Sequence, residues 1–145
     1  MDPFSNSSEF KLDHIGIAVQ NLEQGAAFYK ALGFLGMHIE VVPTEKVKVG
    51  MFELANQARV ELLEPVTPDS AVGKFLEKRG PGIHHICFKV KDIRSIMRRL
   101  EEAGMQLINK EPTPGAHNCL VAFVHPKSTG GVLIELSESQ AQGDD

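Results

Sequence analysis

The amino-acid sequence predicts an α+β fold made of two tandem βαβββ modules, whose mixed sheet closes into a cupped, barrel-like shape. Residues 12–19 and 83–90 are similar alternating segments, and His14 and His85 within them lie 71 positions apart (85 − 14). A strand, a helix cap and a helix-ending glycine recur at this offset. Residues 59–64 and 133–138 are also similar, at an offset of 74 (135 − 61). A long period that occurs twice indicates a duplicated module rather than a solenoid.

Composition limits the class of protein. A chain of 145 residues supports one compact domain with a real core, here expected at residues 10–138. The net charge of −4 and the absence of a Lys and Arg block argue against a nucleic-acid partner. No apolar run approaches the roughly 20 residues of a membrane helix, so no membrane partner is expected.

The ends and the cysteines point to a cytoplasmic protein. Residues 1–9 lack the apolar centre of a signal peptide and are predicted to be disordered, and residues 139–145 form a polar tail. Cys87 and Cys119 have no CxxC spacing, so we expect two reduced thiols rather than a disulfide.

The first module is predicted at residues 10–64. In its first strand, alternation places His14, Gly16 and Ala18 on one face and a row of apolar side chains on the other. Asn21 is the expected N-cap of a helix that ends at Gly33. Three further strands are predicted at residues 37–42, 46–54 and 59–63, with turns at 43–45 and 56–57.

A joint at residues 65–81, with a short helix over 71–78, leads to the second module at 82–138. The second module repeats the first with a helix at 93–103 capped by Asp92. Its strands are expected at residues 83–90, 105–108, 120–124 and 132–136, with loops at 111–115 and 125–131. We expect the helices to cover one face of the sheet and the two opposite faces to close over a shared cleft.

Four polar side chains recur on the face away from the apolar row: His14, Glu61, His85 and Glu135. An inward glutamate on a half-buried strand is costly unless it is paired or binds a metal. Imidazole and carboxylate together suit zinc, cobalt, nickel, manganese or iron. Any one of these residues alone is more simply an ordinary polar residue of a solvent-facing sheet. Their duplication favours a shared divalent-metal site in the cleft, where the small Gly16 and Ala18 would leave room.

The remaining histidines have simpler interpretations. His84 alternates to the face opposite His85 and is predicted to be structural. His117 lies in a glycine-containing loop, and neither it nor the other histidines has an expected partner.

Several segments resemble the vicinal-oxygen-chelate superfamily of glyoxalases, bleomycin-resistance proteins and dioxygenases. They are residues 13–19, 60–65, 84–86, 125–127 and 130–136. Within this superfamily the chain is most similar to the methylmalonyl-CoA epimerases. The resemblance implies one divalent metal, most often cobalt or zinc, held by His14, Glu61, His85 and Glu135, and it implies a homodimer.

The resemblance also implies a reaction. It is epimerisation of methylmalonyl-CoA, or of a related 2-substituted acyl-CoA, by α-proton exchange through a metal-stabilised enolate. Glu135 and Glu45 are the candidate acid and base. The family usually has glutamate directly after the proline of this turn, whereas here Thr44 follows Pro43 and Glu45 comes one position later. On an extended backbone that single step would reverse the direction of the side chain.

Two other functions stay open. A glyoxalase I-type lactoylglutathione lyase would use a similar ligand set on a glutathione adduct instead of an acyl-CoA thioester. A non-catalytic small-molecule binding or resistance protein would lack bound metal. A ring-cleaving dioxygenase is disfavoured, because it needs two histidines and one carboxylate and this chain offers a second carboxylate.

Overall fold

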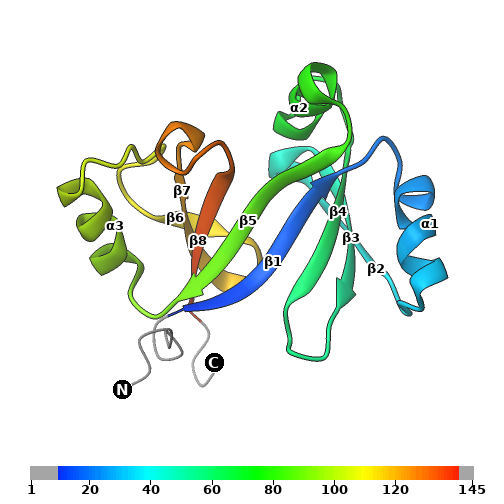
Figure 1. Ribbon diagram of the computed structural model, residues 1–145, viewed down its shortest axis with the longest axis horizontal. Helices are drawn as coiled ribbons and strands as arrows, with labels where there is room; N and C mark the ends of the chain where they lie inside the picture. Colours follow the sequence, from blue (N-terminus) through cyan, green and yellow to red (C-terminus); the bar gives the residue numbers. More distant parts are fainter. Residues whose placement is uncertain (1–9, 141–145) are drawn as a thin grey trace. The chain divides into compact units, whose positions relative to one another are not determined.

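The computed structural model describes residues 10–140, so the predicted disordered segment 1–9 and residues 141–145 of the predicted tail lie outside it (Figure 1). The described chain divides into two compact units. One is His14–His85, and the other combines residues 10–13 with residues 86–140. Strands β1 (Phe10–Ala18) and β5 (Gly82–Val90) are each divided between the two units.

The unit His14–His85 has a mixed sheet with strand order β2-β3-β4-β1. Strand β4 runs antiparallel to β3 and parallel to β1, and β2 runs antiparallel to β3. Besides parts of β1 and β5, its elements are α1 (Leu22–Leu32), β2 (His38–Val42), η1 (Pro43–Glu45), β3 (Val47–Glu53), β4 (Arg59–Pro65) and α2 (Ala71–Arg79).

Helix α1 begins and ends where the sequence predicts. The Asn21 side chain accepts a hydrogen bond from the Gln24 amide, and Gly33 ends the helix in the left-handed conformation, with φ of 115°. The amide of Leu22 donates to Glu64 Oε1 at 2.7 Å, so strand β4 supplies a second cap. Helix α1 covers one sheet face through an apolar cluster that includes Leu22, Ala26, Phe52 and Leu62.

Helix α2 packs on the opposite face of the same sheet. The Ser70 hydroxyl caps it by accepting from the Gly73 amide. Its Val72 and Leu76 bury a second cluster with Ala18 and Leu63, as well as residues of β3. The expectation that helices cover one face only is therefore wrong for this unit, because alternation sends Leu62 to α1 and Leu63 to α2.

The other unit contains α3 (Ile93–Glu102), β6 (Thr113–Gly115), η2 (Ala116–Asn118), β7 (Cys119–Val124), η3 (Pro126–Ser128) and β8 (Leu133–Ser139). Its strand order is β5-β8-β7-β6, with antiparallel β6–β7 and β7–β8 pairs. The Asp92 side chain caps α3, and the amide of Ile93 donates to Glu138 Oε1 at 2.8 Å. Helix α3 buries an apolar cluster with Val90, Ala122 and Leu136.

The predicted strand at residues 105–108 is reduced to one isolated bridge between Leu107 and Val124, and the predicted loop at 111–115 contains β6. Two backbone bonds still join this segment to residues 123–125, from Ile108 to Phe123 and from His125 to Gln106. The next residue, Asn109, bonds β7 through its side chain: its Oδ1 accepts from the Phe123 amide at 2.8 Å, and its Nδ2 donates to the Val121 carbonyl.

The predicted α+β class and the two successive βαβββ sets of elements are confirmed. None of the helices within residues 10–140 is long and apolar enough to cross a membrane. Cys87 is buried and Cys119 is half-buried, and neither forms a disulfide.

Candidate metal centre

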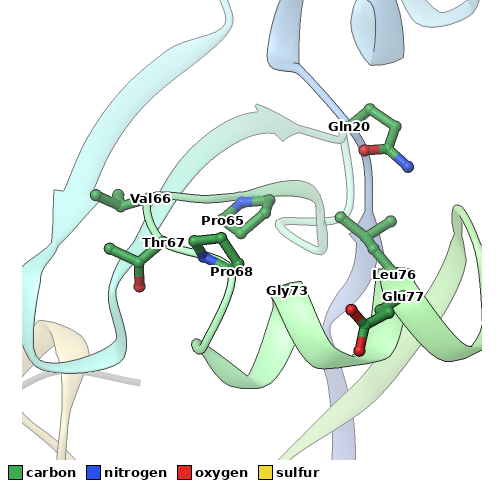
Figure 2. A pocket seen from close by; sticks show the side chains of 8 residues that line it. All are labelled: Gln20, Pro65, Val66, Thr67, Pro68, Gly73, Leu76 and Glu77. Carbon is green, nitrogen blue, oxygen red and sulfur yellow. The ribbon is translucent and has the colours of Figure 1, made fainter.

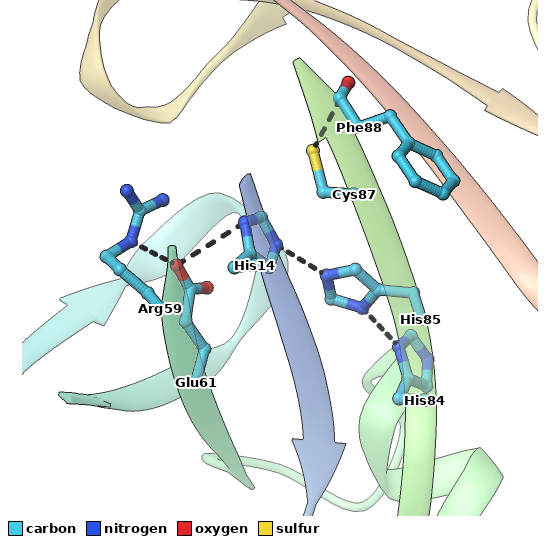
Figure 3. Close-up of polar contacts among 7 residues, drawn as sticks. All are labelled: His14, Arg59, Glu61, His84, His85, Cys87 and Phe88. Carbon is cyan, nitrogen blue, oxygen red and sulfur yellow. Dashed lines mark hydrogen bonds and ion pairs between the residues drawn. The ribbon is translucent and has the colours of Figure 1, made fainter. Parts of the chain in front are cut away.

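Two of the predicted metal ligands face each other in the unit His14–His85. His14 lies on β1 and His85 on β5, and their Nε2 atoms are 2.9 Å apart (Figure 3). The two rings meet edge to face, with centroids 5.0 Å apart and planes at 88°. Both residues are buried, with exposed fractions of 7% and 9%. Strand alternation had placed both side chains on the face away from the apolar row, and that placement brings the two nitrogens together.

His85 is held as the neutral base. The pKa of His85 is lowered from 6.5 to about 3. Burial is the largest cause, and the nearby His14 and His84 rings add to it. A neutral imidazole keeps a lone pair on one ring nitrogen, which is the form that binds a metal ion.

Glu61 approaches His14 from the other side. It is buried on β4 and its Oε2 lies 3.6 Å from His14 Nδ1 (Figure 3). The same oxygen accepts a hydrogen bond from Arg59 Nε at 3.0 Å. Arg59 therefore compensates a carboxylate that burial would otherwise make costly. His14 lies between Glu61 at Nδ1 and His85 at Nε2.

The His14 and His85 nitrogens fit a shared cation. Two nitrogens that bind one ion at about 2.1 Å are roughly 3 Å apart when the bonds meet at a right angle and about 3.4 Å apart in a tetrahedral site. The observed Nε2–Nε2 distance of 2.9 Å is near the right-angle value. Two neutral imidazoles beside a buried carboxylate also provide the chemical mixture that zinc, cobalt and related divalent ions prefer.

The two small residues of β1 do not line an open cavity. A Cβ atom added to Gly16 would come within 2.7 Å of His85 Nδ1 and 2.8 Å of His85 Nε2. The space at Gly16 is thus filled by the His85 ring. Ala18 is fully buried in the cluster beneath α2. The prediction that both residues leave room in a cleft is wrong, because side chains of the same unit occupy that room.

His84 contacts His85, although strand alternation predicts that the two side chains point to opposite faces. Its Nδ1 lies 2.9 Å from His85 Nδ1, and the two rings meet edge to face. The pair of adjacent histidines was visible in the sequence. Their contact was not, because alternation assigns neighbouring strand residues to opposite faces.

Two further predicted site residues are Glu135 and Glu45. Glu135 is half-buried on β8, opposite Phe123 of β7, and belongs to the unit that contains residues 86–140. Glu45 is exposed and ends the 3₁₀ turn η1. Because this turn has about three residues per turn, Thr44 and Glu45 point roughly 120° apart rather than in the opposite directions expected of an extended strand.

A shallow hollow of about 400 Å³ lies at the joint between β4 and α2 (Figure 2). Its lining residues are Gln20, Pro65, Val66, Thr67, Pro68, Gly73, Leu76 and Glu77. None of them is a predicted ligand, and Glu77 is the only ionisable group among them.

Comparison with known proteins gives the family and its characterised members. The Glyoxalase/Bleomycin resistance protein/Dioxygenase superfamily matches residues 13–123. The uncharacterised protein YqjC of Bacillus subtilis is 43% identical over 88% of this chain and 91% of its own length. An ethylmalonyl-CoA/methylmalonyl-CoA epimerase of Cereibacter sphaeroides is 41% identical over 88% of this chain and 97% of its own.

A solved structure agrees with the sequence comparison. A methylmalonyl-CoA epimerase in complex with methylmalonyl-CoA and NH4+ superimposes with a TM-score of 0.81 at 37% identity. The match covers 92% of this chain and 97% of that one.

Proposed function

Because this chain belongs to the glyoxalase/bleomycin resistance protein/dioxygenase superfamily, we propose that it is a divalent-metal-dependent epimerase of methylmalonyl-CoA or a related 2-substituted acyl-CoA. The observation that carries the proposal is the buried His14–His85 pair, with facing nitrogens at 2.9 Å and Glu61 beside it. The epimerases of this superfamily support the choice of reaction, since they match this chain over most of its length at about 40% identity.

His14, Glu61, His85 and Glu135 are the proposed ligands, with cobalt or zinc as the proposed ions. A divalent cation held there would supply Lewis-acid stabilisation for negative charge that develops on the thioester oxygen during proton loss. His85 suits this role because burial lowers the pKa of its ring, which favours the form with a free lone pair. Arg59 can remain beside Glu61 while the carboxylate binds the ion, since a carboxylate has two oxygens and about four acceptor positions.

The proton exchange needs an acid and a base on opposite sides of the α-carbon. We propose Glu135 for one side and Glu45 for the other. The 3₁₀ turn supports Glu45 in this role. In this turn the Glu45 side chain is rotated by about 120° from Thr44, whereas in an extended strand it would point the opposite way. Solvent exposure in the free protein also lets Glu45 exchange its proton with water between turnovers.

The reaction is tested by incubating the protein, loaded with Co²⁺, with methylmalonyl-CoA in deuterated water. Deuterium at the α-carbon, detected by mass spectrometry, is the expected result. The matched assay uses the methylglyoxal–glutathione adduct under the same conditions. Turnover of the adduct without α-deuteration would instead establish the lactoylglutathione lyase. If both reactions fail and the purified protein holds no metal, the result would establish a binding protein.

The ligand set is tested by metal analysis of the variants Glu61→Ala and Glu135→Ala, purified in parallel with wild type. Each should lose metal affinity by more than the roughly 10- to 100-fold that a supporting residue costs. Glu53→Ala, which removes an exposed carboxylate at the end of β3, is the matched control and should keep wild-type occupancy. Unchanged occupancy in Glu61→Ala would remove Glu61 from the ligand set.

The homodimer and the cytoplasmic location are parts of the same proposal. An acyl-CoA substrate and two cysteines outside any disulfide agree with a reducing compartment. Light scattering after gel filtration tests the dimer.

A further inference from the structure

We propose that His84 and Gly16 are positioning residues, which hold the His85 ring in the orientation and tautomer that a cation requires. This inference deepens the proposed metal site and rests on that proposal.

The contact between the two adjacent histidines couples their tautomers. With Nδ1 of His84 and Nδ1 of His85 at 2.9 Å, one nitrogen donates and the other accepts. When His85 Nδ1 carries the hydrogen, the lone pair of His85 lies on Nε2 and points toward His14. Ligand histidines commonly donate their second N–H to a neighbouring acceptor in this way, which fixes the ring and the tautomer.

Glu61 acts on His14 in the same sense. Its carboxylate lies 3.6 Å from His14 Nδ1 and favours a hydrogen on that nitrogen, which leaves the lone pair on Nε2. At an Nε2–Nε2 distance of 2.9 Å, one proton or one cation must lie between the two nitrogens. A cation can therefore take the place that the shared proton holds in the metal-free protein.

The His84 ring is itself fixed by helix α2. It meets the ring of Phe75 edge to face, with centroids 5.1 Å apart, and Arg79 lies over the same Phe75 ring at 5.8 Å. Helix α2 is thus connected to His85 through the Phe75–His84 ring contact and the His84–His85 hydrogen bond.

Gly16 fixes the opposite side of the His85 ring. The ring lies so close to the Gly16 backbone that any Cβ would overlap three of its atoms. The backbone of Gly16 is ordinary strand, so an alanine there would meet no conformational penalty. Its effect would come from displacing the imidazole.

The test compares His84→Phe with His84→Asn. Phenylalanine keeps a ring against Phe75 but removes both nitrogens, whereas the asparagine amide oxygen can accept a hydrogen bond near the position of Nδ1. We expect His84→Phe to weaken Co²⁺ binding by about 10-fold or more and to change the visible spectrum of the bound ion, with partial rescue in His84→Asn. Gly16→Ala should weaken Co²⁺ binding similarly.

A second measurement needs no metal. Long-range ¹H–¹⁵N correlation spectra of the metal-free protein report the tautomer of His85, which should be Nδ1–H in wild type and change in His84→Phe. The control is His38→Phe, which removes an exposed histidine of β2 and should change neither property. If the His85 tautomer and the Co²⁺ spectrum are the same in wild type and His84→Phe, the inference is wrong. If wild type binds no Co²⁺ but the tautomer changes as expected, the proposed metal function fails and the positioning of the His85 ring stands.

Discussion

The two units use the same device to start their helices but surround their key glutamates differently. Glu64 accepts from the first amide of α1, and Glu138 accepts from the first amide of α3, at 2.7 and 2.8 Å. By contrast, Glu61 has Arg59 two residues before it on its strand, and Glu135 has the uncharged Leu133 in that place. The capping glutamate is present in both units because the first amides of a helix need a hydrogen-bond acceptor.

Helix α2 is the other difference. It follows β4 in the first unit, whereas the described chain ends soon after β8 in the second. It packs on the sheet face that also carries His14 and Glu61, through Leu63 and Ala18. Helix α2 and both contacting histidines thus belong to the same unit, His14–His85.

The largest effect on stability is expected from the equivalent core leucines, Leu62 and Leu136. They occupy the same position of the repeat and are 0% and 5% exposed. Leu62→Ala and Leu136→Ala should each lower the free energy of unfolding by about 2–5 kcal/mol, measured by urea titration, because each leaves a cavity. Leu35→Ala, at an 88% exposed residue, is the control and should change it by about 0.5 kcal/mol or less. A loss from one leucine but not from the other would show that the two cores are not equivalent.

A smaller effect is expected from the two capping glutamates. Glu64→Ala and Glu138→Ala should each cost about 1–2 kcal/mol of unfolding free energy, because each leaves a helix amide without its carboxylate acceptor. The same urea titrations measure this, and the metal affinity should stay at the wild-type value. Loss of metal in Glu64→Ala but not in Glu138→Ala would mean that Glu64 supports the metal site as well as the helix.

The smallest effect concerns the joint at residues 65–81 of the unit His14–His85. The Thr67 hydroxyl and the Lys46 ammonium group lower the pKa of Asp69 from 3.8 to about 2. Since the folded pKa is below the unfolded one, Asp69 stabilises the folded state above pH 3.8, and this contribution is lost as the pH falls toward 2. Asp69→Asn should therefore melt slightly below wild type at pH 5 and at the same temperature near pH 2. A constant difference in melting temperature would contradict the assignment.

Much of this protein follows from its sequence alone. The repeat at an offset of 71 predicts the order of the elements, and short-range chemistry at Asn21, Gly33 and Asp92 predicts where the helices begin and end. The faces carrying His14 and Glu61 followed from alternation. These features depend on neighbours within a few residues or on a period of two, so they can be read without the fold.

Other features were decided by tertiary structure. The Asn109 side chain bonds β7, helix α2 fills the face expected to be open, and His84 contacts His85 against the rule of alternation. Each depends either on a contact between side chains far apart in the sequence or on a side chain that departs from strand alternation. The space at Gly16 belongs to the same group, since only the packed chain shows that an imidazole 69 positions away (85 − 16) fills it.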